Sequence, residues 1–226
     1  MNEDSPTFCK FSVNFPPSNQ PGPNAIMIRT ADKHAKIIEA AIKVFSRKGF
    51  FNARIADIGK EAQVADGTIY LYFNNKYDIL ISLFEEEIGK IILEVKLLLD
   101  SEAGDDPRQM LRVFALHHLR MMDDRRELAE VLQMELRQSN KFMREYRLTK
   151  FSEYLDIISG IVKQGQRQGI FRGDVLPGVF KRAFFGALDE TSRLWVLSPD
   201  HSYSIEETAD QITNIFINGI MVTDQQ

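Results

Sequence analysis

The chain has 226 residues, of which 44% are hydrophobic and 27% charged, with a formal net charge of −4 and a pI near 5.7. These values are ordinary for a globular protein of one or two domains that can bury its own hydrophobic core. The single cysteine, Cys9, excludes an intramolecular disulfide framework, and no run of about 18 apolar residues indicates a membrane span. The start of the sequence lacks a secretory signal pattern, so we expect a cytoplasmic protein with no membrane partner.

Composition changes along the chain. Residues 1–28 are rich in proline, serine and asparagine, which predicts a flexible N-terminal arm. Residues 29–76 carry more basic than acidic side chains, whereas residues 77–226 carry more acidic ones. A locally basic segment can bind nucleic acid even in an acidic protein, because the field at the contact surface decides the interaction.

Apolar residues recur at three- and four-residue steps from Asp32 onward, which predicts a helix that ends at Gly49. Short helices are predicted over 55–62 and 67–73, followed by a longer one over 76–99. Helices are also predicted for the rest of the chain, over 107–122, 126–138, 140–167, 176–197 and 205–222. No segment alternates with a two-residue period, so we expect an all-α fold of about nine helices.

The two short helices and the turn between them have the spacing of a helix-turn-helix motif, in which the second helix faces base edges in the major groove. Gly67 has no side chain, so the backbone there can approach a phosphate, and Thr68 can hydrogen-bond a phosphate or a base. Tyr70 and Tyr72 offer hydroxyl groups on stiff rings, although both could instead be core residues. The candidate DNA contacts are Arg54, Gly67, Thr68, Tyr70, Leu71, Tyr72 and Lys76.

The segment from Ile37 to Phe73 resembles the DNA-binding domain of the TetR family of bacterial repressors. The resemblance is carried by IIEAAIKVFSRKGF, by IADIGKEAQVADGTIYLYFNNKYDIL, and most specifically by the pattern G-T-x-Y-x-Y-F-x-x-K. The chain departs from the family at Ala53-Arg54, where a Thr or Ser pair often contacts phosphate. Arg54 would replace that pair by a charged contact, or would be an ordinary surface charge, and the role of Ala53 stays open.

Two further segments, MELRQSN at 134–140 and FGALDETSRLW at 185–195, look like the branch of this family that regulates fatty-acid metabolism. Members of that branch release DNA on binding long-chain acyl-CoA, so the resemblance implies this effector and no other cofactor. Composition and spacing do not indicate the ligand. A sensor of drugs or other hydrophobic ligands, controlling an efflux or catabolic operon, is the alternative.

Methionine and aromatic side chains are abundant between 107 and 195, and they suit either a helical core or the lining of an apolar ligand cavity. His117-His118 lacks the spacing of metal ligands, so no metal site is predicted, and His118 could line the cavity. Arg137 could meet an anionic head group, although a solvated helix end is the simpler interpretation.

Asp189 lies within an apolar helical pattern, so its carboxylate needs either Arg193 on the same helix or a place facing the ligand. The candidate ligand-binding residues are Phe114, His118, Met134, Arg137, Gln138, Phe142, Tyr146, Tyr154, Phe185 and Asp189.

The last two predicted helices are so apolar that a monomer would expose too much hydrophobic surface, which predicts a homodimer with a four-helix interface. Two helix-turn-helix motifs about 34 Å apart would then read palindromic double-stranded operator DNA. The candidate interface residues are Phe180, Phe184, Leu188, Trp195, Ile215, Phe216 and Ile220.

Together these features predict a ligand-responsive transcriptional repressor with the arm at 1–28, a DNA-binding domain at 29–77 and a ligand-binding and dimerisation domain at 78–226. The helix at 76–99 would act as the lever between the two domains. An enzyme or a purely helical interaction module is the rival class, but the sequence shows no nucleophile–base pair, metal spacing or phosphate-binding glycine loop.

Overall fold

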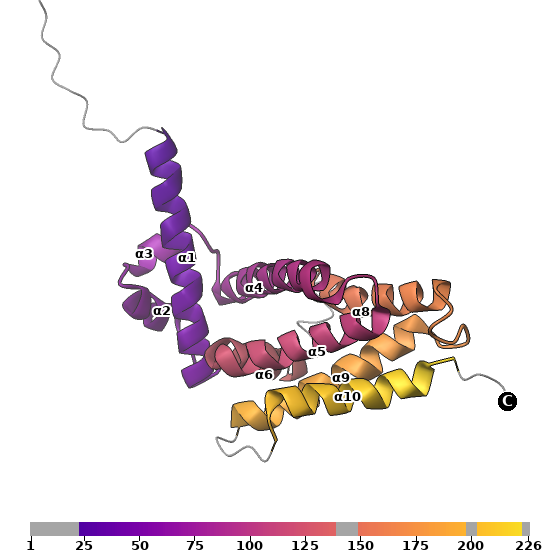
Figure 1. The fold of residues 1–226 in the computed structure, drawn as a ribbon. Coiled ribbons are helices and arrows are strands. Elements are labelled where there is room, and N and C mark those ends of the chain that lie inside the picture. Colours follow the sequence, from indigo (N-terminus) through magenta and orange to yellow (C-terminus); the bar gives the residue numbers. More distant parts are fainter. Residues whose placement is uncertain (1–22, 139–148, 198–202, 223–226) are drawn as a thin grey trace, which may run out of the picture.

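The structure, a computed structural model, describes the backbone of residues 23–138, 149–197 and 203–222, and the side chains of 32–133, 149–195 and 203–222. These parts of the chain contain nine α-helices and one short π-helical segment, so the predicted all-α fold is confirmed (Figure 1). The elements are α1 (Pro23–Lys48), α2 (Ile55–Ala62), α3 (Asp66–Ile69), α4 (Lys76–Leu98), η1 (Leu99–Ala103), α5 (Pro107–Asp124), α6 (Arg126–Gln138), α8 (Thr149–Arg167), α9 (Pro177–Leu197) and α10 (Ile205–Ile220).

Helices α1, α2 and α3 form a small head at one end of the molecule (Figure 1). Helix α1 begins at Pro23, where the fixed φ of proline suits a first helical position, so residues 23–28 are helical and the predicted flexible arm is wrong there. The rest of the arm lies outside the described residues. The core of the head is apolar and includes Ile37, Phe45, Ile58 and Ile69.

The turn between α2 and α3 is tight. Gln63 ends α2 in the left-handed region, with φ 56° and ψ 43°. A Cβ on Gly59 would lie 2.8 Å from Asp66 Oδ1 and 3.0 Å from the Val64 carbonyl oxygen, so only glycine lets α3 pack this closely on α2.

Helix α3 is shorter than predicted, because it ends at Ile69 and residues 70–73 form hydrogen-bonded turns. The amide of Phe73 donates to the carbonyl of Ile69 at 3.0 Å, and this turn carries the Phe73 ring into the core. The Asn75 side chain then accepts from the amides of Tyr77 (2.8 Å) and Asp78 (3.0 Å), which starts α4.

Helix α4 runs from the head into the larger bundle (Figure 1). It continues as the π-helical segment η1 and stops at Gly104, whose φ is 55°. In the bundle, α5 packs against α8, α9 and α10, and α4 packs against α8. Helix α6 also contacts α1, so the head is attached to the bundle through both α4 and α6. None of the helices in the described part of the chain is long and apolar enough to cross a membrane.

Candidate functional site

The outer face of the head presents the predicted recognition segment. Tyr70 is 56% exposed and Leu71 is 81% exposed, whereas Ile69 between Thr68 and Tyr70 is fully buried. Gly67 is also exposed, and a Cβ there would meet no atom within 4 Å, so the fold itself does not require glycine at this position. An exposed tyrosine and leucine beside the exposed backbone of Gly67 are typical of a surface that binds a partner.

Two of the predicted DNA contacts are tied to the head's own core. Tyr72 is half-buried, with its ring edge-on to His34 at 6.1 Å. The ammonium of Lys76 donates to the carbonyls of Phe50 (2.5 Å), Phe51 (3.1 Å) and Ala53 (2.8 Å). Three acceptors match the three protons of a lysine ammonium, so the charge of Lys76 is engaged within the head.

Ala53 and Arg54, where the sequence departs from the TetR pattern, lie directly before α2 and have different roles. Ala53 is buried in the head core, so its role is packing. Arg54 is exposed, and its backbone amide donates to Asp57 at 3.0 Å, which caps α2 and leaves the guanidinium at the surface.

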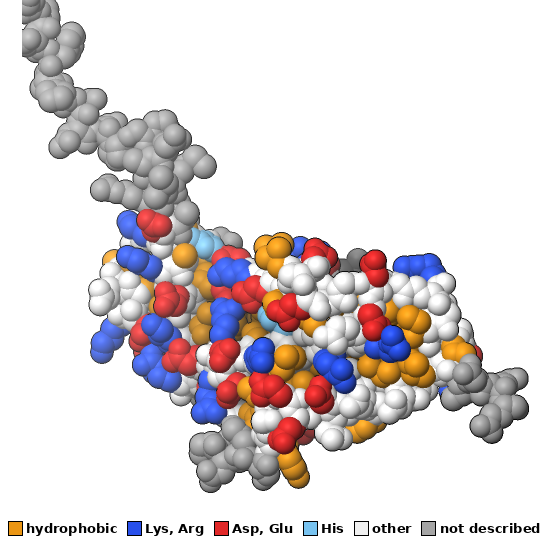
Figure 2. Space-filling view, in the orientation of Figure 1, with side chains coloured by type: hydrophobic (Ala, Val, Ile, Leu, Met, Phe, Trp, Pro, Cys, Tyr) orange, Lys and Arg blue, Asp and Glu red, His pale blue; other side chains and the backbone are white. Residues whose placement is uncertain are grey.

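Some of the basic residues of the head are neutralised by acids within it, as the mixture of blue and red side chains in Figure 2 shows. Arg47 pairs with Glu61 at 2.5 Å and Lys48 with Asp57 at 2.7 Å, which joins α1 to α2. The hydrogen bonds from Arg47 and Lys48 lower the pKa values of Glu61 and Asp57 below their ordinary range. Lys60, which sequence reasoning passed over, is exposed on α2, the first helix of the helix-turn-helix.

The interior of the bundle contains an apolar cavity of about 20 Å³ that brings four predicted ligand residues together, namely His118, Tyr154, Phe185 and Asp189. This volume holds about one water molecule and is far below the roughly 300–1,000 Å³ of a typical ligand pocket. Phe114 lies just behind the wall, with its ring 5.0 Å from that of Tyr154. An acyl chain is therefore larger than the cavity in this structure.

The remaining predicted ligand residues cannot be placed in the cavity. Met134, Arg137 and Gln138 belong to the end of α6, where side chains are outside the described set, and Phe142 and Tyr146 lie outside the described residues altogether.

Sequence reasoning missed the part of the cavity wall that α4 supplies. Ile88 and Ile91 of α4 and Leu132 of α6 line the cavity together with Met121 and Met122 of α5. The isoleucines and the leucine carry no signal beyond the apolar stripe of a buried helix face, so only the three-dimensional arrangement identifies them.

Polar groups inside the cavity wall are few. The His118 Nδ1 atom lies 3.0 Å from the Tyr154 hydroxyl, and the other ring nitrogen, Nε2, has no hydrogen-bond partner among the described residues. Burial lowers the pKa of His118 to about 3, aided by the neighbouring His117, and burial also raises the pKa of Tyr154. Both side chains are therefore neutral at physiological pH.

Polar residues around Asp189 are held by hydrogen bonds and an ion pair. Gln133 donates to the Ser192 hydroxyl at 2.9 Å, which joins α6 to α9. Arg193, the partner predicted for Asp189, makes an ion pair with Glu190 at 2.5 Å. In the described part of the chain, no group of three or more His, Cys, Asp or Glu side chains converges as metal ligands would.

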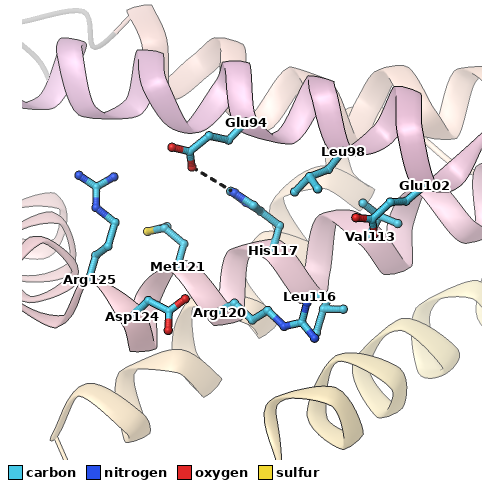
Figure 3. Close-up of a pocket in the computed structure, with 10 residues that line it drawn as sticks. All are labelled: Glu94, Leu98, Glu102, Val113, Leu116, His117, Arg120, Met121, Asp124 and Arg125. Atoms are coloured by element: carbon cyan, nitrogen blue, oxygen red, sulfur yellow. Dashed lines mark hydrogen bonds and ion pairs between the residues drawn. The ribbon is translucent and has the colours of Figure 1, made fainter.

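A surface groove of about 240 Å³ lies between α4 and α5, and Met121 lines both this groove and the interior cavity. Figure 3 shows Glu94 of α4 reaching His117 of α5, whose Nε2 atom lies 3.4 Å from the carboxylate. The groove is also lined by Glu102, Asp124, Arg120 and Arg125, so it carries charges of both signs.

The structure corrects most of the predicted dimer contacts. Phe180, Phe184, Leu188, Trp195 and Ile220 are buried inside the subunit, because α9 packs on α5 and α8 and α10 packs on α5. Of the other two predicted residues, Ile215 is 68% exposed and Phe216 is half-buried. The exposed large apolar side chains on or directly before the two helices are Leu176, Val179, Leu194 and Ile215, where Leu176 directly precedes α9.

Known proteins resemble the chain in both parts. Residues 37–83 match the family described as bacterial regulatory proteins, tetR family, and residues 84–219 match the C-terminal region of YsiA-like proteins. The "Fatty acid metabolism regulator protein" of Bacillus subtilis (strain 168) is 34% identical over 188 residues, which cover 83% of this chain and 95% of that protein. The "HTH-type transcriptional repressor NicS" of Pseudomonas putida is 33% identical over 150 residues, or 65% of this chain and 68% of that protein.

Solved structures agree with these matches. The transcriptional regulator FadR from Bacillus subtilis, in complex with stearoyl-CoA, superposes with a TM-score of 0.75 at 34% identity and covers 82% of this chain and 98% of its own. The fatty acid degradation regulator FadR from Bacillus halodurans gives a TM-score of 0.74 at 32% identity, with the same coverage.

Proposed function

The chain belongs to the TetR family of bacterial transcriptional regulators, and from this premise we propose that it represses fatty-acid metabolism genes and releases their operators on binding long-chain acyl-CoA. The observation that carries the proposal is the position of α4, which forms a wall of the cavity and also leads directly into the head. The stearoyl-CoA complex of the FadR relative supports the class of effector. A repressor of chromosomal genes would act in the cytoplasm.

The proposed DNA-reading surface is the exposed face of the head. Gly67 and Thr68 would approach the phosphate backbone, while Tyr70 and Leu71 would enter the major groove. Tyr72 and Arg54 would contact the edge of the same site. We place the division between the head and the effector-binding region near residue 77, where α4 leaves the head.

The proposed dimer would pair the exposed apolar face of α9 and α10 with the same face of a second copy. Leu176, Val179, Leu194 and Ile215 would be buried there, which removes an apolar surface that a monomer would leave in water. The two heads of such a dimer would read the two halves of a palindromic operator.

The switch would follow from the small size of the cavity. An acyl chain cannot fit into about 20 Å³, so binding must push Ile88 and Ile91 outward and move α4. Lys76, the first residue of α4, holds the loop 50–53 of the head through its three carbonyl contacts. A displacement of α4 would therefore shift the head, and a coupling of about 1–3 kcal/mol would weaken operator binding about 5- to 150-fold.

An operator-release assay tests this function. A duplex enriched from genomic fragments by binding to the purified dimer would be titrated with the protein, with and without palmitoyl-CoA, and with CoA alone as the control. We expect palmitoyl-CoA to weaken binding at least fivefold and CoA alone to leave it unchanged. Unchanged binding at saturating palmitoyl-CoA would rule out the acyl-CoA effector but not DNA recognition.

One observation favours a second candidate effector. Three carboxylates, those of Glu94, Glu102 and Asp124, line the groove that shares Met121 with the cavity, and they outnumber the two guanidinium groups of Arg120 and Arg125 there. Such a rim suits a cationic hydrophobic compound, as a drug-sensing regulator would bind. Release of the same duplex by a cationic dye such as rhodamine 6G, and not by palmitoyl-CoA, would favour this alternative.

A further inference from the structure

His118 is a polar residue of the cavity wall, and one of its ring nitrogens has no hydrogen-bond partner in the described part of the chain. Its side chain on α5 is 1% exposed and lies against the Phe185 ring, with the centroids 5.4 Å apart in an edge-to-face arrangement. The Nε2 atom has no partner in the described part of the chain, although a buried polar atom without a hydrogen bond costs about 1–3 kcal/mol. An apolar residue of similar shape would avoid this cost, so the histidine indicates a polar atom on the ligand.

The hydrogen bond to Tyr154 determines what Nε2 can do. Among the described residues, His118 Nδ1 is the acceptor available to the Tyr154 hydroxyl, at 3.0 Å, so the hydroxyl donates to it. In a neutral imidazole whose Nδ1 accepts, the proton is on Nε2. The burial that lowers the pKa of His118 to about 3 keeps the ring neutral. The cavity therefore contains one uncharged N–H donor.

The rest of the wall restricts the acceptor that this donor can meet. The other lining residues are apolar except Tyr154 and Asp189, and no lysine or arginine is among the residues described as lining the cavity. A free carboxylate would bring a charge into this apolar space at a high desolvation cost. A carbonyl oxygen is uncharged and accepts one hydrogen bond without that cost.

We propose that His118 Nε2–H donates a hydrogen bond to the acyl carbonyl of the effector, with Tyr154 as the positioning residue that fixes the imidazole tautomer. This inference rests on the proposed effector site and adds the chemical class of ligand that the site selects. The site takes acyl thioesters or esters, and discriminates against chains without a carbonyl and against free fatty acids.

A pair of CoA derivatives tests the inference directly. Palmitoyl-CoA and S-hexadecyl-CoA have the same number of chain carbons, but the thioether lacks the carbonyl oxygen. Binding to the full-length dimer would be measured by isothermal titration calorimetry, with palmitate as a third ligand. We expect palmitoyl-CoA to bind about tenfold more tightly than S-hexadecyl-CoA, as the loss of one buried hydrogen bond predicts.

Substitutions test whether His118 causes this difference in affinity between the two CoA derivatives. We expect His118→Phe to bind the two CoA derivatives with equal affinity, and Tyr154→Phe to reduce the difference because Nε2 is no longer held as the donor. His34→Phe replaces a histidine of the head, outside the cavity, and should preserve the tenfold difference.

The result that would overturn the inference alone differs from the result that would overturn the proposed function as well. Equal affinity of the wild-type protein for the two derivatives would overturn the inference and leave the proposed function intact. Failure of palmitoyl-CoA to bind at all would remove both. If His118→Phe does not fold, ¹⁵N spectra of the wild-type histidines decide, because the Nε2–H resonance should shift with palmitoyl-CoA far more than with S-hexadecyl-CoA.

Discussion

The head and the effector-binding region differ in what they bury. In the head, the buried residues of the described chain are hydrophobic apart from Gly59. In the bundle, the described core also contains polar side chains, namely Glu87, His118, Gln133, Ser159, Ser192 and Thr213. The head thus presents its functional groups outward from an apolar core, whereas the bundle holds polar groups inside, where each must be partnered by the fold or by a ligand.

Because of this difference, substitutions in the head and in the bundle should change different properties of the protein. A change on the exposed face of the head should alter DNA binding and leave stability almost untouched. A change at a buried polar group of the bundle should alter stability first, because the removal of one partner leaves the other unsatisfied in the interior.

The largest effect is expected at Glu87. This carboxylate on α4 is 3% exposed, and it accepts hydrogen bonds from Arg125, at the junction of α5 and α6, and from Lys90 at 2.6 Å. Glu87→Ala should lower the free energy of unfolding by about 3 kcal/mol, since it leaves the partly buried Arg125 guanidinium without its acceptor. Urea denaturation followed by circular dichroism measures this loss.

Lys90→Ala is the matched control, because it removes an exposed partner of the same carboxylate. An exposed ion pair contributes little, so we expect a loss below about 1 kcal/mol. Equal losses in the two variants would contradict the distinction between buried and exposed polar groups.

The second prediction concerns pH. The folded-state pKa of His118 is about 3, below the unfolded value of about 6.5, so its contribution to stability is complete above pH 6.5 and is lost as the pH falls toward 3. Between pH 7 and pH 5 the protein should lose about 2 kcal/mol from this group, at about 1.36 kcal/mol per pKa unit. Urea denaturation at the two pH values measures it.

His118→Phe should remove most of that pH dependence. Carboxylates whose pKa values are lowered, such as those of Asp57 and Glu61, titrate below this range and do not contribute to it. A wild-type protein that is equally stable at pH 7 and pH 5 would show that His118 is not held neutral by burial.

More of the head than of the bundle could be predicted from the sequence, and the reason is physical. The recognition segment is one continuous stretch, so the exposure of Tyr70 and Leu71 and the burial of Phe73 are set by local backbone turns within it. The cavity is assembled from five helices, and an isoleucine that lines it, such as Ile88, has the same local pattern as one that does not.

The predictions that the structure corrects have the same cause, because contacts between segments that are distant in the sequence leave no local pattern. Phe184 and Leu188 were predicted at the dimer interface because α9 is apolar on more than one side, and sequence cannot tell which side faces α5 and α8. Lys76 was predicted to contact DNA from its place at the start of a helix, and its contacts with the carbonyls of Phe50 and Ala53 could not be foreseen because those residues are distant in the sequence. The family resemblance supplied the effector class, which no local pattern carries.

The third prediction isolates the outer face of the head. Tyr70→Ala should weaken operator binding about tenfold, since one groove contact is worth about 1–3 kcal/mol, and should change the stability by less than about 0.5 kcal/mol. Tyr203→Ala is the control, because Tyr203 is 72% exposed and lies directly before α10, outside the recognition segment. Fluorescence anisotropy with a labelled duplex measures the affinity. A marked loss of stability in Tyr70→Ala would show that this ring supports the fold.

The smallest effect is expected at Lys76, where the two regions meet. Lys76→Gln removes an ammonium that binds three carbonyls and lies 4.5 Å from the centre of the Phe50 ring, so it should cost about 1 kcal/mol of stability. Because this charge is engaged within the head, the slope of log affinity against log salt concentration should stay as in the wild type. Lys60→Gln, at the exposed lysine of α2, should show the reverse, with unchanged stability and a salt slope smaller by about 0.9. If Lys76→Gln lowers the slope as well, its ammonium contacts phosphate in the complex, and the anchor between α4 and the head must open when DNA binds.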